Sequence, residues 1–133
     1  MSDLNIDDFR RDTAITLIRL YNNFPTPHTL YINEVCGEDS EDEFGLISRR
    51  YEACLAAMVW LADEGFIQYK TLITDQGIEQ ATLCLLGIEL LLGANPDGIS
   101  RIETLRLGLS SKSSTKLELA INELLSSAVS RKL

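Results

Sequence analysis

The chain has 133 residues, of which 45% are hydrophobic and 24% are charged. This length fits one domain of ordinary size, and the composition excludes a chain that is disordered throughout. The formal net charge is −8. Because duplex-binding proteins gain much of their affinity from Lys and Arg side chains on phosphates, this charge disfavours nucleic acid as a partner. An acidic protein binds a duplex only where bases gather on one face, and here the positive charge lies in residues 98–133.

The cysteines and the absence of a long apolar run indicate a cytoplasmic protein. Cys36, Cys54 and Cys84 are an odd number with no short pairing motif, which is typical of reduced thiols. No run approaches the roughly 20 apolar residues that cross a membrane. The acidic first residues lack the basic and then apolar layout of a signal peptide. We therefore expect neither a membrane span nor a membrane partner.

Hydrophobic spacing predicts that the first half of the chain is mainly helical. Ala14, Leu17 and Tyr21 fall on one face of a first helix. Pro25 ends this helix, because the residue before a proline leaves helical space. Gly65 is a natural terminator for a later, longer helix, since it can adopt the left-handed conformation. The predicted elements are a helix over about 7–23, a strand over Thr29–Ile32, a brief helix from Asn33 to Val35, an acidic loop over Glu38–Glu43 and a helix from Phe44 or Ser48 to Glu64.

The second half is predicted to hold a hairpin followed by helices. Gly77 supplies the positive φ of a tight turn between two strands. Thr115 and Glu118 form a capping box that opens the last helix, and Gly108 is expected to interrupt the helix before it. The predicted elements are strands over Phe66–Lys70 and Ile78–Cys84, a helix over Leu86–Leu92, an interrupted helix over Ile99–Leu109 and a last helix with the apolar stripe Leu117–Val129.

Two stretches in this order resemble the winged helix-turn-helix family. Residues 60–67, Trp-Leu-Ala-Asp-Glu-Gly-Phe-Ile, are similar to the end of the third helix and the first wing strand of that family. Residues 83–91, Leu-Cys-Leu-Leu-Gly-Ile-Glu-Leu-Leu, are similar to the second wing strand and the helix that follows it. In that second stretch Gly87 would let the helix approach the hairpin closely. The resemblance covers about residues 7–92.

The resemblance implies a mainly α fold with a small β-hairpin, as in small bacterial-type winged-helix proteins, with additional C-terminal helices. Residues 1–94 would form the winged-helix-like domain. Residues 95–133 would form a helical extension that packs either on this domain or on a second subunit.

Three departures from the family pattern concern function. Cys84 stands where a Thr usually caps the helix, and Leu85 and Leu86 follow where polar residues are common. The segment before the long helix is acidic, although that helix reads the DNA groove in the family. Between Lys70 and Glu79 the hairpin has no base except Lys70 itself, whereas wings that grip a phosphate backbone carry more.

No catalytic, cofactor or metal site is expected. His28 and Cys36 are eight residues apart, with no second pair to complete a tetrahedral site. His28 also lacks an obvious nucleophile and orienting acid, and the chain has no glycine-rich phosphate loop. The acidic loop Glu38–Glu43 lacks the spacing of a calcium loop, so it is either a solvated loop or a contact for a basic protein.

Three further expectations concern side-chain packing. Trp60 has apolar neighbours on both sides and is expected in the core. Arg10 and Arg11 are expected to pair with acids of the same helix. Arg49 and its neighbour either contact phosphates or form a solvated helix face, and their spacing fits both.

These observations rank three functional hypotheses. The first is a non-enzymatic regulatory module that works by protein–protein contact, including self-association as a homodimer. The second is a DNA-binding transcriptional regulator, which the fold makes common by analogy, and an enzyme is a distant third. The candidate partner surface is Leu85, Leu86, Leu117, Ile121, Leu124 and Leu125. The candidate DNA contacts are Arg49, Arg50, Lys70, Lys112 and Lys116.

Overall fold

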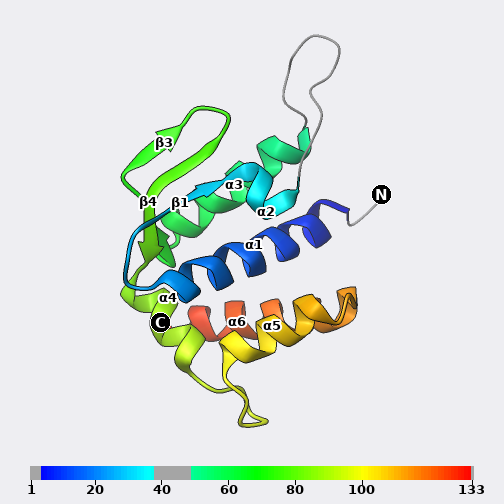
Figure 1. The fold of residues 1–133 in the computed structure, drawn as a ribbon. Coiled ribbons are helices and arrows are strands. Elements are labelled where there is room, and N and C mark those ends of the chain that lie inside the picture. Colours follow the sequence, from blue (N-terminus) through cyan, green and yellow to red (C-terminus); the bar gives the residue numbers. More distant parts are fainter. Residues whose placement is uncertain (1–3, 38–48, 133) are drawn as a thin grey trace.

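The computed structural model describes residues 4–37 and 49–132 of the chain. It is mainly helical, with a small four-stranded antiparallel sheet and three helices after the sheet (Figure 1). The predicted acidic loop Glu38–Glu43 lies outside the described residues, as do the two predicted helix starts Phe44 and Ser48. In chain order the elements are α1 (Leu4–Asn23), β1 (His28–Tyr31), α2 (Ile32–Cys36), α3 (Arg49–Asp63), β2 (Ile67–Gln68), β3 (Thr71–Ile73), β4 (Gly77–Leu83), α4 (Leu85–Leu92), α5 (Arg101–Ser110) and α6 (Ser114–Lys132).

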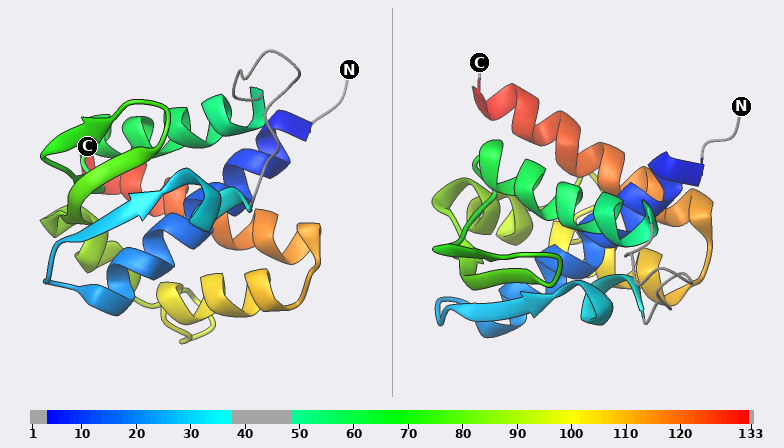
Figure 2. Two further views of the ribbon diagram at one scale, coloured as in Figure 1. Left: turned by 45° about the horizontal axis from the view of Figure 1, so that its top comes forward. Right: turned by 90° about the horizontal axis from the view of Figure 1, so that it is seen from above.

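The first helix, α1, lies at the centre of the molecule (Figures 1 and 2). It contacts α3 and β4 on one side and α5 and α6 on the other. Because neighbours cover it on both sides, its buried residues are not confined to one narrow stripe. Leu17 and Leu20 are buried, and so are Asp12 and Thr16. This helix therefore joins the two layers of the molecule into one unit.

The sheet is built around β4, which pairs with the other three strands. β2 and β3 share one register with β4, since Ile67 pairs with Leu83 and Thr71 pairs with Glu79. They are two parts of the first hairpin strand, which is longer than predicted and is broken in the middle. β1 pairs with the edge of β4 that lies opposite β2 and β3, and the pairing has a register shift characteristic of a β-bulge. Gln80 has a φ of 53° beside this shift.

One hydrophobic core joins residues 1–94 to residues 95–133. Ile78 of the sheet belongs to the same cluster as Leu105 and Ile121 of the C-terminal helices. α6 packs on α5 and on α1 of the same chain. For this reason Leu117, Ile121 and Leu124 are buried, and they do not form the predicted partner surface.

Three local predictions are wrong. Gly108 does not interrupt α5; it is buried, and a Cβ there would lie 3.2 Å from the Cα of Leu117, so it lets α5 and α6 approach closely. The residue that caps the start of α6 is Ser113 and not Thr115, since the Oγ of Ser113 accepts a hydrogen bond from the backbone N–H of Lys116. Trp60 is 37% exposed and lies at the surface.

Two glycines shape the passage from α3 to α4 as predicted. Gly65 follows the end of α3 with a φ of 89°, the left-handed conformation that Gly adopts most easily. A Cβ on Gly87 would lie 2.3 Å from the carbonyl oxygen of Phe66. The close approach of α4 to the hairpin therefore requires Gly at this position.

Candidate functional site

The predicted partner surface does not form one patch. Leu85 is 80% exposed on α4, whereas Leu86 and Leu125 are half-buried. The other three members belong to the core, as described above. Leu125 is the member that takes part in a larger apolar area, because it lines a hollow together with Trp60.

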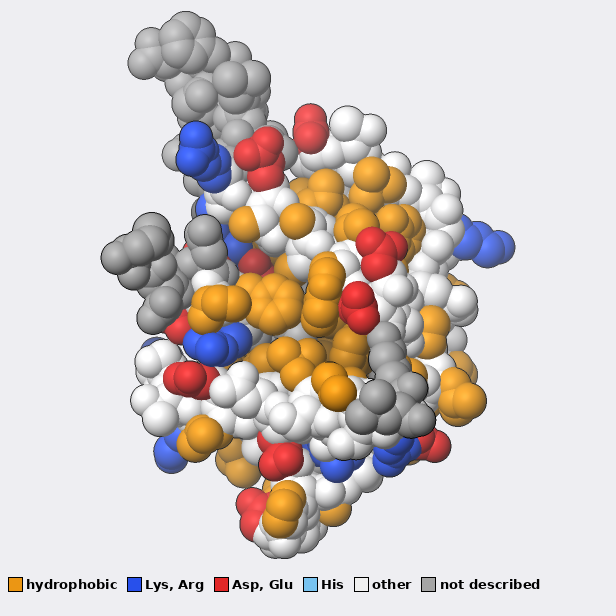
Figure 3. Space-filling model, turned by 180° about the vertical axis from the view of Figure 1, so that it is seen from behind, with side chains coloured by type: hydrophobic (Ala, Val, Ile, Leu, Met, Phe, Trp, Pro, Cys, Tyr) orange, Lys and Arg blue, Asp and Glu red, His pale blue; other side chains and the backbone are white. Residues whose placement is uncertain are grey.

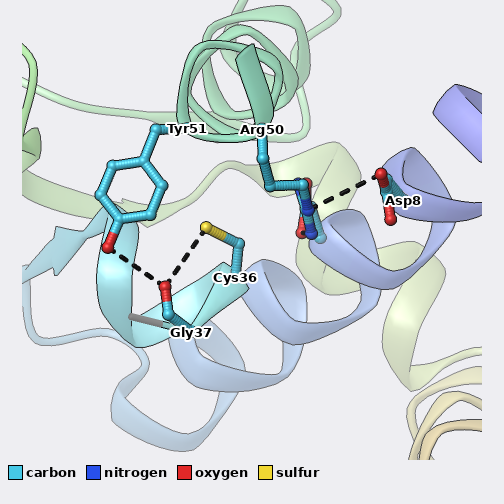
Figure 4. A network of polar contacts seen from close by, with 6 residues as sticks. Asp8, Cys36, Gly37, Arg50 and Tyr51 are labelled. Carbon is cyan, nitrogen blue, oxygen red and sulfur yellow. Dashed lines mark hydrogen bonds and ion pairs between the residues drawn. The ribbon is translucent and has the colours of Figure 1, made fainter. Parts of the chain in front are cut away.

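Arg50, one of the predicted DNA contacts, points inward. Its guanidinium donates two hydrogen bonds of 2.6 Å to the carboxylate of Asp12 and lies 3.6 Å from Asp8 (Figure 4). The hydrogen bonds to Asp12 and the negative charge of its carboxylate raise the pKa of Arg50 above the ordinary value. Because Asp12 is buried, this ion pair joins α1 to α3 and holds the guanidinium away from any phosphate.

A second polar contact lies in the same corner of the molecule (Figure 4). The hydroxyl of Tyr51 donates a hydrogen bond of 3.1 Å to the carbonyl oxygen of Gly37. The thiol of Cys36 lies 3.7 Å from the same oxygen. These contacts hold the end of α2 against the start of α3.

The structure does not gather the remaining predicted DNA contacts into one basic surface. Arg49 is exposed at the start of α3, and Lys70 is exposed between β2 and β3. Lys112 lines a hollow together with Asp7 of α1, while Lys116 lines a different hollow between α5 and α6. Acidic side chains therefore lie among the basic ones. The expected pairing of Arg10 and Arg11 with acids of their own helix is confirmed for the first of them, which forms an ion pair with Asp7.

The apolar surface that sequence reasoning missed surrounds Trp60. The ring of Trp60 lies 5.4 Å from that of Phe9 in an edge-to-face arrangement. The ring of Phe66 lies 6.3 Å from that of Trp60 and is stacked with it. These two aromatic contacts hold the indole in place at the surface. A side chain that is already ordered loses little conformational entropy when a partner covers it.

Two hollows meet at Trp60, and we name them together the Trp60 groove. One, of about 460 Å³, lies between α3 and the β3–β4 turn. The other, of about 240 Å³, lies between α3 and α6. Figure 3 shows hydrophobic side chains gathered at the centre of this face. The groove is lined by Leu55, Ala56, Val59, Trp60, Phe66, Leu125, Ala128 and Val129 and by the acids Glu52, Asp63, Glu64 and Asp75.

The ionisable side chains that line the Trp60 groove are all acidic in the described part of the chain. Glu52 and Asp63 are exposed near the two ends of α3, and Asp75 is exposed in the β3–β4 turn. Three exposed carboxylates around a concave surface create a negative potential. Such a surface attracts cationic groups and repels phosphates.

The sequence holds a signal for this groove. Ala56 and Trp60 lie one helical turn apart on α3, and Glu52 precedes them at the same spacing. Asp63 continues the stripe towards the end of the helix. The bulk of Trp60 and its apolar neighbours favoured a core position, whereas the acids on the same stripe marked an exposed one.

A second exposed apolar area lies between α5 and α6. Leu107 and Leu119 are 52% and 64% exposed, and both line a hollow of about 770 Å³ together with Ile99. The lining of this hollow includes Lys116 as well as Glu123. Its charge is therefore mixed, in contrast to that of the Trp60 groove.

The described residues include no group of three or more His, Cys, Asp or Glu side chains placed to hold a metal ion. Among the described helices, none combines the length and the apolar character needed to cross a membrane. Comparisons with protein-family models, with curated proteins and with solved structures find no match for this chain.

Proposed function

We propose that this chain is a non-enzymatic, winged-helix-like module that works through protein–protein contacts. The element order of helix, strand, two helices and hairpin supports the winged-helix frame. The strand order β1-β4-β2 supports it as well, since it places the first strand beside the second strand of the hairpin. In this frame α3 takes the place of the helix that reads the DNA groove.

The observation that carries the proposal is the character of the outer face of α3. A DNA-reading face offers basic and hydrogen-bonding side chains to phosphates and base edges. The outer face of α3 instead offers Ala56 and Trp60 between the acids Glu52 and Asp63. An exposed aromatic residue in an apolar hollow is typical of the centre of a protein interface, where a few anchors supply most of the binding free energy.

A DNA-binding regulator has weaker support. Arg50 is engaged with the buried carboxylate of Asp12, and Asp7 shares a hollow with Lys112. The basic side chains that remain would have to hold a duplex close to acidic groups, which repel phosphates.

We extend the proposal to self-association through the apolar area between α5 and α6. In a two-fold contact the same patch faces itself, so a patch with charges of both signs can be self-complementary. Lys116 and Glu123 line this hollow together with Leu119. Light scattering over a concentration series is expected to give a dimer for the unchanged chain and a monomer for Leu119→Lys. A monomer at every concentration for both proteins would remove this part of the proposal.

Site-specific photo-crosslinking in the source cells tests the protein-contact proposal. Benzoylphenylalanine in place of Ala56, in the Trp60 groove, is expected to give discrete adducts with protein. The same residue in place of Glu103, which is exposed on α5, is the control and should not give them. Identical adducts from both positions, or none from Ala56, would contradict the proposal.

The DNA-binding alternative is tested by fluorescence anisotropy with a labelled random duplex at several salt concentrations. We expect no binding even at low salt, because the protein carries a net charge of −8. Binding that weakens steeply with salt would favour the regulator instead, and the slope would give the number of phosphates contacted.

A further inference from the structure

We propose that the Trp60 groove binds a basic amphipathic helix of a protein partner. The apolar face of that helix would lie on Trp60, and its Lys and Arg side chains would meet the acids around the groove. This inference rests on the proposed protein-contact function and names the chemistry of the partner.

The length of the outer face of α3 fits a bound helix. From Glu52 to Asp63 the outer face of α3 extends about 16 Å at 1.5 Å per residue. The hollows on the two sides of Trp60 lie between α3 and the β3–β4 turn and between α3 and α6. A helix laid in such a groove places its anchors one turn apart, as in other helix-in-groove complexes. About three turns of a partner helix would cover this length.

The charge of the groove selects among occupants. Glu52, Asp63, Glu64 and Asp75 line it, and no Lys or Arg does so among the described residues. A second copy of this chain, docked through the same groove, would place these carboxylates against their own counterparts. An acidic or phosphorylated segment would meet the same repulsion. A basic helix is complementary, and complementary charge both accelerates association and suppresses wrong partners.

The position of Trp60 makes it the natural anchor. Trp is among the residue types that most often dominate interface binding energy, especially near the centre of an apolar patch. Trp60 lines both hollows, and its ring contacts those of Phe9 and Phe66. A partner that covers the exposed part of the indole would remove apolar surface from water without having to order the side chain first.

Trp60 also supplies a direct readout, because it is the one tryptophan of the chain. The probe is a synthetic helical peptide of about 14 residues, or four turns, with Leu at i, i+3, i+4 and i+7, Lys at the other positions and no aromatic residue. Titration of the full chain with this peptide is expected to shift the Trp60 emission to shorter wavelength in a saturable way. Added salt should weaken the binding, since part of the attraction is between charges. A peptide of the same composition without the apolar stripe should give no shift.

Two pairs of variants localise the binding. Ala56→Lys places a charge on the apolar floor of the groove and should weaken peptide binding at least about tenfold. Leu92→Lys, at an exposed position of α4 outside both apolar areas, makes a change of the same kind and should not weaken it. Asp63→Lys reverses one acid of the groove and should weaken binding about five- to tenfold. Glu103→Lys changes the net charge equally but lies on α5, so it corrects for long-range attraction. Thermal unfolding followed by circular dichroism confirms that each variant is folded.

The outcomes separate this inference from the broader proposal. Equal binding of a peptide with Glu in place of every Lys, or no emission shift with the basic peptide, would overturn the basic-helix inference. Crosslinks from Ala56 would still support a protein contact in that case. If the Ala56→Lys variant binds the peptide as tightly as the unchanged chain, the Trp60 groove is not the binding site. An emission shift on addition of duplex DNA would overturn both the inference and the proposed function.

Discussion

The buried carboxylate of Asp12 is held by the guanidinium of Arg50. Asp12 is 1% exposed, and both of its oxygens accept hydrogen bonds from that guanidinium. Removal of one partner from a buried pair leaves a charge that water cannot solvate well. We expect Arg50→Ala to lower the free energy of unfolding, measured by urea denaturation, by about 2–3 kcal/mol, slightly less than for a fully buried pair because Arg50 is only half-buried.

The neighbouring residue provides the control for this prediction. Arg49 is exposed, so Arg49→Ala should change the free energy of unfolding by no more than about 0.5 kcal/mol. Arg50→Lys keeps the positive charge but loses the two-pronged geometry, and its stability should lie between those of the other two variants. Equal stability of Arg49→Ala and Arg50→Ala would mean that the ion pair does not stabilise the fold.

The thiol of Cys54 should be almost unreactive in the folded protein. Burial raises its pKa, and the negative charge of Asp12 raises it further. Because the thiolate is the reactive form, a raised pKa lowers reactivity at every pH below it. In a chain with Cys36→Ser and Cys84→Ser, we expect labelling at pH 8 to be slow in buffer and fast in urea. Labelling in buffer as fast as that of an unfolded peptide would contradict this expectation.

At the scale of the elements, α4 lacks a side-chain cap. Cys84 has the extended conformation of an N-cap residue, with φ −86° and ψ 173°, but its side chain forms no capping hydrogen bond. A hydroxyl at this position can accept the hydrogen bond from an N–H of the first turn. We expect Cys84→Ser to raise the free energy of unfolding by about 0.5–1 kcal/mol. Cys84→Ala, which has no acceptor, should not do so, and equal gains from both variants would rule out capping as the cause.

At Gly87, where α4 contacts the hairpin, we expect a substitution to lower the stability of the fold. In an exposed helix Gly→Ala usually stabilises by about 1 kcal/mol. Gly87→Ala would instead drive a methyl group into the carbonyl oxygen of Phe66, and we expect a loss of about 2–3 kcal/mol in the free energy of unfolding. Leu85→Ala, at an 80% exposed position of the same helix, should change stability by less than about 0.5 kcal/mol. A stabilised Gly87→Ala variant would show that the backbone adjusts easily.

Local patterns predicted most elements of this fold correctly. The spacing around Leu17 placed α1, Gly65 marked the end of α3, and the turn before Ile78 placed the hairpin. These predictions succeed because helical periodicity, helix ends and turns depend on residues that are close in the sequence. Gly87 is different, because it is required by contact with Phe66, which is distant in the sequence. Its role was expected from the resemblance of residues 83–91.

Features that depend on distant segments were not predictable in this way. The pairing of β1 with β4, in which His28 meets Ala81, joins segments that no local pattern connects. The burial of Ile121 could not be derived from its helix alone, because an apolar stripe is equally suited to its own chain and to a second one. Trp60 is an intermediate case. The acids on its stripe of α3 mark an exposed position, but the cover on the indole depends on α6 and the hairpin turn, which are distant in the sequence.

At the scale of the whole molecule, residues 1–94 and 95–133 share one core, so neither part should fold alone. Without α5 and α6, the face of α1 that they cover would be exposed to water, together with the partners of Leu105 and Ile121. We expect a fragment that ends at residue 94 to lack a cooperative thermal transition by circular dichroism.

Adding back the missing part is the control for this prediction. A separate peptide of residues 99–132 should restore a cooperative transition when mixed with the fragment, because it supplies the missing core side chains. A fragment that unfolds cooperatively by itself would show that the first part is an independent domain.

The central position of α1 also sets the order of events during synthesis. α1 ends at Asn23, whereas α6, which packs on it, begins at Ser114. At a synthesis rate of about 5–20 residues per second, the ribosome makes α6 about 5–20 s after α1. During that interval an apolar face of α1 is already made but still uncovered. The nascent chain is therefore a natural client for a chaperone, and a stall before α6 would leave it prone to aggregation.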